Sequence, residues 1–196
     1  MPHFFAYIDR MKYIQRWNTM RNSRSENIQE HSLQVAILAH ALAIIKNHYY
    51  EGHVNAEYTA LLAIYHEASE VITGDLATPI KYYSPEFRKA YRELEVMASS
   101  RLSDLLPPEL QPYYADLLSA EPTQSIESML VKAADKLAAY LKCLDEVKSG
   151  NREFQSAHDA ILIELRQYPE PAVQHFLDHF ADSYSLNLDE LNKPQS

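Results

Sequence analysis

Four residues in this sequence have side chains that bind metal ions, and three separate stretches supply them. His31 begins a long apolar stretch, His66 and Glu67 lie in LLAIYHEASEVITGD (residues 61–75), and Asp135 lies in LVKAADKLAAYL. Aspartate is a poor residue for a helix interior, and a buried carboxylate is costly unless it is paired or bound to a metal. Two imidazoles with two carboxylates suit a six-coordinate divalent ion such as Mn²⁺, Co²⁺, Fe²⁺ or Mg²⁺ better than a closed structural zinc site.

Each of these residues also has a purely structural interpretation. A single histidine such as His31 in a buried helix is usually a packed residue with one satisfied nitrogen. Asp135 could form a local ion pair with Lys132 or Lys136, although the alanines around it leave room for another helix or a metal centre. The pattern therefore indicates a metal site only if the separate stretches meet in space.

The stretch HEASE adds a further carboxylate to the set. His66 and Glu70 are four residues apart and share one face of the expected helix, whereas Glu67 is turned by roughly 100° from His66. The alternative is that both glutamates are solvated and His66 fills a gap, so HEASE alone is a weak signal. His175 and His179 are also four apart, and we expect them on the surface of a terminal helix, outside the metal site.

The elements that must position these residues are helices. Apolar residues recur at helical spacing almost everywhere, and only three glycines occur in 196 residues, which argues against a turn-rich β fold. We expect an all-α fold, a single domain over residues 1–196 with roughly seven to nine helices and a frayed tail at about 189–196. The expected helices cover about 3–16, 27–45, 56–72, 84–106, 109–118, 125–150, 152–167 and 170–181.

Capping residues define several of the expected helix ends. Asn27 followed by Glu30 suggests a capping box, and Ser84 and Ser125 suit N-caps. Gly74 stands where a C-terminal cap belongs, so GDLATPIKYYSP (residues 74–85) is expected to be a loop.

The helix expected over 27–45 carries apolar residues on most of its sides, which is typical of a buried helix. We expect protein to cover two of its faces. The first consists of Leu33, Ile37, His40 and Ile44, and the second of Leu38, Leu42 and Ile45.

Composition and charge exclude several classes of function. The formal net charge of −9 repels phosphate backbones and anionic lipid, so we expect no nucleic acid and no membrane as partners. The single cysteine, Cys143, excludes an internal disulfide framework and fits a reducing compartment. We see no signal peptide and no apolar run near the ~18 residues of a membrane span. These features predict a cytoplasmic protein.

The spacing of the candidate ligands matches a known signature. His31, YHEASE and Asp135 resemble the H…HD…D pattern of the HD-domain metal-dependent phosphohydrolases. Three longer stretches closely resemble the bacterial HD-domain 5′-deoxynucleotidases, and the similarity spans most of the chain in order. These stretches are RWNTMRNSRSENIQEHSLQVA, ALLAIYHEASEVITGDLATPIKYY and LVKAADKLAAYLKCL. The resemblance implies an all-helical homodimer that removes phosphate from deoxyribonucleoside 5′-monophosphates with one divalent ion, such as Co²⁺, Mn²⁺ or Mg²⁺.

The resemblance also implies roles for individual residues. The metal ligands would be His31, His66, Glu67 and Asp135. The residues implicated in catalysis would be Glu70, Arg16 and Asp75. The substrate contacts would be Arg16, Trp17, His31, Asp75, Leu76, Ala77, Thr78 and Asp135.

Elementary chemistry suits these roles. Glu70 can orient or deprotonate an attacking water, and Arg16 can hold phosphate oxygens in a bidentate fork. Trp17 can pack against the sugar and leave no room for a 2′-hydroxyl, which would select deoxyribose by exclusion. Asp75 and Thr78 can hydrogen-bond a 3′-hydroxyl. The alternatives are a surface arginine on a loop and a core tryptophan.

Position 67 departs from the family pattern, because this chain has glutamate where the signature has aspartate. Glutamate keeps the charge but adds a methylene group. Glu67 could bind the metal with a shifted geometry, or it could leave the metal to three protein ligands and water. The third alternative is a degenerate site that only binds nucleotide.

Three other functions stay open on the sequence alone. A deoxynucleoside triphosphate hydrolase on the same fold would need more cations around the site than Arg16, Arg21, Arg24, Lys81 and Lys132. A non-catalytic nucleotide sensor is motivated by Glu67. A purely structural helical module leaves the mid-helix Asp135 unexplained.

Overall fold

The fold is all-α, as the sequence predicts. The computed structural model describes residues 1–81, 83–120 and 124–193, and this part of the chain contains helices, turns and one isolated bridge between Gln15 and Asn27 but no strand. The α-helices are α1 (Phe4–Ile8), α2 (Ile28–Tyr49), α3 (Ala56–Tyr65), α4 (Glu70–Thr73), α5 (Thr78–Lys81), α6 (Pro85–Ser103), α7 (Gln111–Tyr114), α8 (Ile126–Lys148), α9 (Gln155–Arg166), α10 (Pro171–His179) and α11 (Leu188–Leu191). The 3-10 helices are η1 (Asp9–Tyr13), η2 (Arg152–Phe154) and η3 (Ala181–Ser185).

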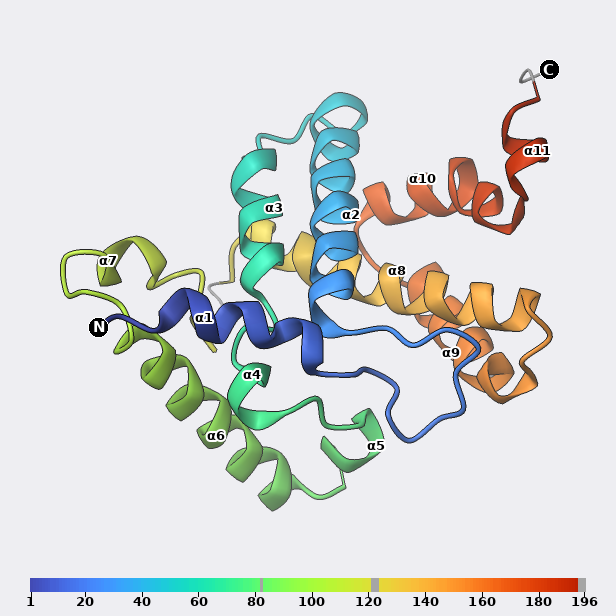
Figure 1. The fold of residues 1–196 in the computed structure, drawn as a ribbon. Coiled ribbons are helices and arrows are strands. Elements are labelled where there is room, and N and C mark those ends of the chain that lie inside the picture. The colour runs from blue at the N-terminus through green and yellow to red at the C-terminus, as the bar shows by residue number, and fades with distance from the viewer. Residues whose placement is uncertain (82, 121–123, 194–196) are drawn as a thin grey trace.

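Helix α2 stands at the centre of the fold, with α3 and α8 packed against it (Figure 1). Its start is fixed by Asn27, whose side chain accepts hydrogen bonds from the backbone N–H groups of Gln29 and Glu30. The core that these three helices enclose includes Val35, Leu38, Leu42, Leu130 and Leu137, and these side chains are fully buried. Burial of this apolar surface is the main stabilising term of the domain core.

The prediction that protein covers two faces of α2 is wrong for one of them. Leu33, Ile37 and Ile44 are 61%, 62% and 48% exposed, and His40 is exposed beside them. The helix can bury only the side that faces α3 and α8, and residues spaced by three or four positions from Ile28 onward already occupy that side. The apolar stripe of Leu33, Ile37 and Ile44 is therefore open to solvent.

Helix α2 is long and apolar enough, by length and composition alone, to cross a membrane. That finding departs from the expectation that no stretch comes close to a membrane span. However, 56% of its most apolar window is buried inside the fold, and the helix lies near the N-terminus. A core helix has the same composition, so α2 is weak evidence for membrane insertion.

Several predicted helices are divided or shortened. The helix predicted over 56–72 ends at Tyr65, and turns over residues 66–69 separate α3 from α4. The helix predicted over 3–16 is α1 followed by the tighter η1. It ends at Tyr13, because Ile14 is extended. The predicted loop 74–85 contains the single-turn α5. The tail predicted to fray overlaps α11, whose N-terminus is capped by a capping box between Asn187 and Glu190. Residues 194–196 lie outside the described part.

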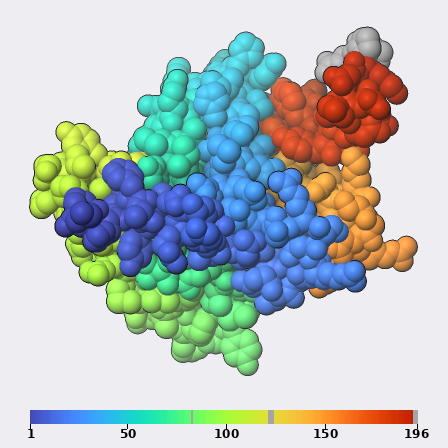
Figure 2. All heavy atoms as spheres, viewed as in Figure 1, coloured from blue at the N-terminus to red at the C-terminus, as the bar shows by residue number. Residues whose placement is uncertain are grey.

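The N-terminal segment lies across one face of the molecule, between α6 and α7 on one side and the C-terminal helices on the other (Figures 1 and 2). Phe4 is buried in a second apolar cluster with Ala68, Leu102, Leu106 and Leu118. This cluster joins α1 to α6 and to the turn that follows α3. It therefore fixes the backbone at Ala68, two residues after His66.

Candidate metal centre

The four candidate metal ligands come together at one point. One ligand atom from each of His31, His66, Glu67 and Asp135 lies within 4.8 Å of every other. His31 comes from the first turn of α2, His66 and Glu67 follow α3, and Asp135 lies in the middle of α8. Nε2 of His31 lies 2.9 Å from Oδ1 of Asp135. The three helices that pack around the core are thus the elements that build this centre.

His66 is oriented for a ligand by its own helix. Its Nδ1 lies 2.7 Å from the backbone oxygen of Ala63, so this nitrogen carries the proton and Nε2 keeps its lone pair. Nε2 is buried and has no hydrogen-bond partner among the described residues. A backbone carbonyl on the second ring nitrogen is the usual support of a metal-binding histidine. The centre therefore fits a divalent cation in its donor atoms and in their orientation.

Glu67 lies in the same group despite its extra methylene. Its Oε1 is 3.4 Å from Nε2 of His66, and its side chain is 19% exposed. Burial raises the pKa of Glu67, but the neighbouring side chains of His66 and Glu70 outweigh burial and bring that pKa to about 2. Glu67 thus presents an ionised oxygen to the centre.

Glu70 is a buried carboxyl group beside the centre, 3% exposed at the start of α4. Its Oε1 accepts a hydrogen bond from Nζ of Lys81 at 3.2 Å, while Oε2 has no hydrogen-bond partner within the described part of the chain. Burial and the neighbouring charge of Glu67 raise the pKa of Glu70, and Lys81 opposes them only in part. Without a cation, Glu70 therefore keeps a proton. A cation held by Glu67 would offset the charge of Glu67 and lower the pKa of Glu70, so that its carboxylate could act as a base.

Arg16 and Trp17 lie on the loop between η1 and α2. Trp17 has a backbone φ of +55°, its ring packs on Phe154 at a centroid distance of 5.3 Å, and its side chain is half-buried. Arg16 is also half-buried, and its Nη1 has no hydrogen-bond partner in residues 1–81, 83–120 and 124–193. Burial raises the pKa of Asp135, but a hydrogen bond from His31 outweighs burial and holds that pKa well below its usual range. The guanidinium of Arg16 helps to lower it. Arg16 therefore lies close enough to the metal centre for its charge to act on Asp135.

The loop predicted to contact substrate reaches the same region. Burial raises the pKa of Asp75, while Arg16 and Lys81 pull it down, so all three side chains are close in space. The side-chain amide of Asn18 donates to the backbone oxygen of Asp75 at 3.1 Å and ties this loop to the loop of Arg16. Leu76 and Ala77 are half-buried, whereas Thr78 is exposed at the start of α5. Gly74 supplies the left-handed turn, with φ +72°, that begins this loop.

A cavity of about 210 Å³ opens next to the centre, between α3, α6, α8 and the segment that follows α7. His66 and Asp135 form part of its wall, so it communicates with the candidate metal position. Lys132 lines this cavity, and Lys136 pairs with Glu164 instead of with Asp135. The remaining lining residues, which the sequence did not single out, include Leu62, Ser69, Glu95, Asp116, Leu117, Ser119, Ala120, Ser128 and Val131.

His175 and His179 lie outside the centre. Their rings pack together at a centroid distance of 4.4 Å, and Tyr49 stacks on His175 at the same distance. His179 is exposed and His175 is half-buried. Neither belongs to the one group of candidate ligands found in the described part of the chain.

The helical arrangement around His31, His66, Glu67 and Asp135 is the fold of the HD-domain phosphohydrolases. Two solved structures share the fold. An HD-domain phosphohydrolase from Listeria innocua has a TM-score of 0.82 at 22% identity, covering 97% of this chain and 92% of that one. The HD phosphohydrolase DatZ of cyanophage S-2L, solved with dA and one catalytic Zn²⁺ ion, has a TM-score of 0.60 at 18% identity, covering 92% and 95%.

Sequence comparison gives the particular family. The chain belongs to the YfbR-like 5′-deoxynucleotidases, whose family model matches residues 3–184. It is 50% identical over 190 residues to 5′-deoxynucleotidase VV1113 of Vibrio vulnificus, covering 97% of this chain and 98% of that protein. It is 51% identical over 194 residues to a 5′-deoxynucleotidase of Yersinia pestis, covering 98% of each. The resemblance stated from the sequence and the assignment to an enzyme class are confirmed.

Proposed function

We propose that this chain hydrolyses deoxyribonucleoside 5′-monophosphates to deoxynucleosides and phosphate, using one divalent metal ion held by His31, His66, Glu67 and Asp135. The observation that carries the proposal is the convergence of these four ligand atoms within 4.8 Å, in a chain about half identical to curated 5′-deoxynucleotidases over nearly its whole length.

The donor set favours a divalent ion of intermediate hardness. Two imidazole nitrogens and two carboxylate oxygens suit Mn²⁺, Co²⁺, Fe²⁺ or Mg²⁺, which accept mixed nitrogen and oxygen ligands. When bound, such an ion supplies positive charge that polarises a phosphoryl oxygen and lowers the pKa of a coordinated water.

Two side chains of the chain act beside the ion: Arg16 supplies positive charge for the phosphate, and Glu70 supplies acid–base chemistry. A phosphomonoester dianion repels a nucleophile, and the guanidinium of Arg16 is placed to neutralise its oxygens through two parallel hydrogen bonds. Glu70 lies beside Glu67 and keeps one oxygen that no described residue contacts by a hydrogen bond, so that oxygen can accept a hydrogen bond from the attacking water. Lys81 holds the other oxygen and fixes the direction of the carboxyl group.

Trp17 and the loop of residues 75–78 are proposed to bind the sugar. The half-buried indole, packed on Phe154, offers an apolar wall with no partner for a 2′-hydroxyl group. Burying that hydroxyl without a hydrogen bond costs on the order of 1–3 kcal/mol, which favours deoxyribose over ribose by roughly 5- to 150-fold. Asp75 and Thr78 are proposed to bind the 3′-hydroxyl.

The number of cations favours a monophosphate over a triphosphate. Arg16 and Lys81 act on the carboxyl groups of the centre, and Lys132 lines the adjoining cavity. Arg21 and Arg24 are exposed on the loop that follows Trp17. A triphosphate carries more charge than this set neutralises, so a deoxynucleoside triphosphate hydrolase is the second candidate.

We further propose that two copies associate in a cytoplasmic homodimer. The exposed stripe of Leu33, Ile37 and Ile44 on α2 offers an apolar face for a second copy, and the single cysteine, Cys143, is buried as a thiol. Light scattering of the wild-type chain and of Ile37→Lys tests this association, because a charge in the stripe should reduce the measured mass to that of one chain.

Phosphate release from paired deoxy- and ribonucleotides with Mn²⁺, Co²⁺ and Mg²⁺ tests the reaction. We expect phosphate from dAMP and much less from AMP. Pyrophosphate or triphosphate release from dATP, without phosphate from dAMP, would favour the second candidate. Binding of dAMP without turnover in every metal would indicate a nucleotide sensor.

A further inference from the structure

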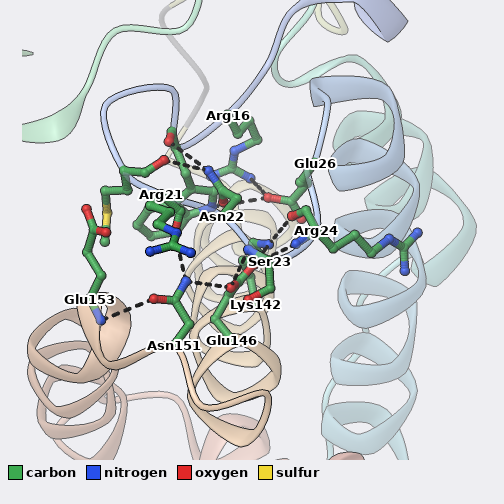
Figure 3. Close-up of polar contacts among 12 residues, drawn as sticks. Arg16, Arg21, Asn22, Ser23, Arg24, Glu26, Lys142, Glu146, Asn151 and Glu153 are labelled. Atoms are coloured by element: carbon green, nitrogen blue, oxygen red, sulfur yellow. Dashed lines mark hydrogen bonds and ion pairs between the residues drawn. The ribbon is translucent and has the colours of Figure 1, made fainter.

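The loop of residues 16–26, here called the substrate loop, carries both Arg16 and Trp17 but contains no regular helix. It begins after η1 and ends at Asn27, the N-cap of α2. A loop of this kind has no internal ladder of hydrogen bonds to fix its side chains. Its geometry must therefore come from specific contacts, and these are shown in Figure 3.

Glu26 contacts both candidate substrate residues. Its carboxylate Oε2 accepts a hydrogen bond from Nε1 of Trp17 at 3.2 Å and lies 3.8 Å from Nη1 of Arg16. The backbone oxygen of Glu26 accepts a further hydrogen bond from the backbone N–H of Arg16 at 2.9 Å. Glu26 is 9% exposed, so water weakens these contacts little. One buried carboxylate thus holds the guanidinium and the indole in a fixed relation.

The conformation of Trp17 needs such support. Its φ of +55° lies in the left-handed region, which costs a non-glycine residue on the order of 1 kcal/mol or more. The side-chain amide of Asn22 donates to the backbone oxygens of Trp17 at 3.1 Å and of Met20 at 2.9 Å. The backbone strain and the indole contact together select one orientation of the ring.

The far side of the substrate loop is fixed to α8, the helix that carries Asp135. Glu146 accepts hydrogen bonds from the backbone N–H of Ser23 at 2.8 Å and of Arg24 at 3.3 Å (Figure 3). Nζ of Lys142 donates to the backbone oxygen of Arg24 at 2.6 Å and pairs with Glu146. These contacts hold the substrate loop in register with the candidate metal ligands.

We infer that Glu26 is a positioning residue, whose single carboxylate aims the Arg16 guanidinium at the phosphate and the Trp17 indole at the sugar. This inference rests on the proposed function, because it requires that Arg16 and Trp17 contact the nucleotide. Phosphate binding and sugar selection are then coupled through one side chain that itself touches neither group.

Two substitutions separate the two contacts. Glu26→Gln keeps an oxygen that can accept from the indole N–H but removes the charge beside Arg16. Glu26→Ala removes both. We expect Glu26→Gln to lower kcat/KM for dAMP by about tenfold while it keeps most of the preference for dAMP over AMP. We expect Glu26→Ala to lower kcat/KM further and to lose most of that preference.

Fluorescence provides a readout that does not depend on activity, because Trp17 is the only tryptophan in the chain. Glu26→Ala should shift the emission of Trp17 to longer wavelength and make it more accessible to acrylamide. Glu26→Gln should change both properties much less. Circular dichroism and thermal unfolding of each variant show whether the rest of the fold is intact.

Glu170 offers a matched control. It is also a buried glutamate, 6% exposed, and it pairs with Nζ of Lys46 at 2.8 Å at the end of α2 opposite His31. Glu170→Gln removes a comparable buried charge away from the substrate loop. We expect it to lower thermal stability without changing Trp17 emission or the ratio of dAMP to AMP turnover.

Arg16→Ala and Trp17→Ala, measured in parallel, distinguish the inference from the proposed function. If both variants turn over dAMP and AMP like the wild type, the proposed roles fail and the inference fails with them. If both lose turnover or selectivity while the Glu26 variants match Glu170→Gln in every kinetic readout, the inference alone is overturned. Loss of selectivity and a changed Trp17 emission in Glu26→Ala, with partial rescue by Gln, would support it.

Discussion

Nε2 of His31 lies 2.9 Å from Oδ1 of Asp135, although 104 positions separate the two residues in the chain. The close approach of α2 and α8 makes this contact possible, and the fully buried Ala134 and Ala138 present no bulk next to Asp135. Burial lowers the pKa of His31, so its imidazole favours the neutral form that binds metal ions. The core packing thus prepares two ligands of the centre before any ion binds.

Removal of Asp135 should empty the proposed metal site. We expect Asp135→Ala to weaken Mn²⁺ binding by at least about 100-fold, since a direct ligand matters at least as much as the groups that orient it. Phosphate release from dAMP should fall with it. Isothermal titration of the metal-free protein measures the first effect. Asp145→Ala, an exposed acid on the same helix, is the control and should bind Mn²⁺ like the wild type. Unchanged binding in Asp135→Ala would revive the purely structural interpretation of this residue.

Glu67 should act as a ligand in spite of its longer side chain. We expect Glu67→Ala to lower metal affinity by roughly 10–100-fold. The variant lacks one ionised oxygen of the four ligand atoms that lie within 4.8 Å of one another. Glu67→Asp should restore most of the affinity and alter the order of preference among Mn²⁺, Co²⁺ and Mg²⁺, because the shorter side chain changes the reach of the oxygen. Metal titrations of the three proteins check both effects. Equal affinity in Glu67→Ala and the wild type would mean that Glu67 stands aside from the ion.

Glu70 should matter for turnover and not for metal binding. Glu70→Gln keeps the shape of the side chain but can neither accept a proton nor carry a negative charge. We expect kcat for dAMP to fall by roughly 10²–10⁴-fold, the usual contribution of a positioned general base. The dissociation constant for Mn²⁺ should stay within a few-fold of the wild type. Glu93→Gln, on the exposed side of α6, is the matched control. A large loss of metal affinity in Glu70→Gln would instead make this residue a metal ligand.

Local signals in the sequence predicted the helix starts well. Asn27, Ser84 and Ser125 each accept a backbone hydrogen bond at the N-terminus of their helix, and Gly74 adopts the left-handed conformation at the end of α4. Such caps depend on residues within one turn of each other, so the sequence contains the information needed to place them.

The break between α3 and α4 was not predictable in this way. Residues 66–69 have ordinary helical propensity, but the backbone forms tighter turns there, with Ala68 N–H bonded to Tyr65 and Glu70 N–H bonded to Glu67. Packing of Ala68 into the second apolar cluster accompanies this change, and no local pattern encodes a contact of that kind. The exposed side of α2 was mispredicted for a related reason, because hydrophobicity alone does not say which neighbours a helix has.

The supporting residues Glu26 and Glu146 were missed for a third reason. Both are glutamates in polar stretches, where a solvated side chain is the usual outcome. Glu146 is 1% exposed only because Ser23, Arg24 and Asn151 bring donors to it from other segments. Lys142 stands four residues before Glu146, and this spacing was the one local signal that could have indicated a paired Glu146.

Glu146 should make the stability of the protein depend on pH in the acid range. Burial raises its pKa, but hydrogen bonds from Lys142, Asn151 and Ser23 outweigh burial and bring the pKa to about 2, below the ordinary value of 4.5. A carboxyl group with a lowered pKa in the folded state stabilises that state at every pH above its unfolded pKa. The contribution disappears as the pH falls from about 4.5 to about 2, because the folded state then has to accept the proton too.

Glu146→Gln should therefore lower the free energy of unfolding by roughly 2–3 kcal/mol at neutral pH, the size expected from a pKa difference of this order. The difference between wild type and variant should narrow steadily between about pH 5 and pH 2, since the wild-type carboxyl group becomes neutral like the amide. Urea unfolding followed by circular dichroism at a series of pH values measures this difference. Glu164→Gln, an exposed acid paired with Lys136, should give a small difference with little pH dependence. A gap between wild type and Glu146→Gln that stays constant down to pH 2 would show that the carboxylate charge is not what holds the substrate loop on α8.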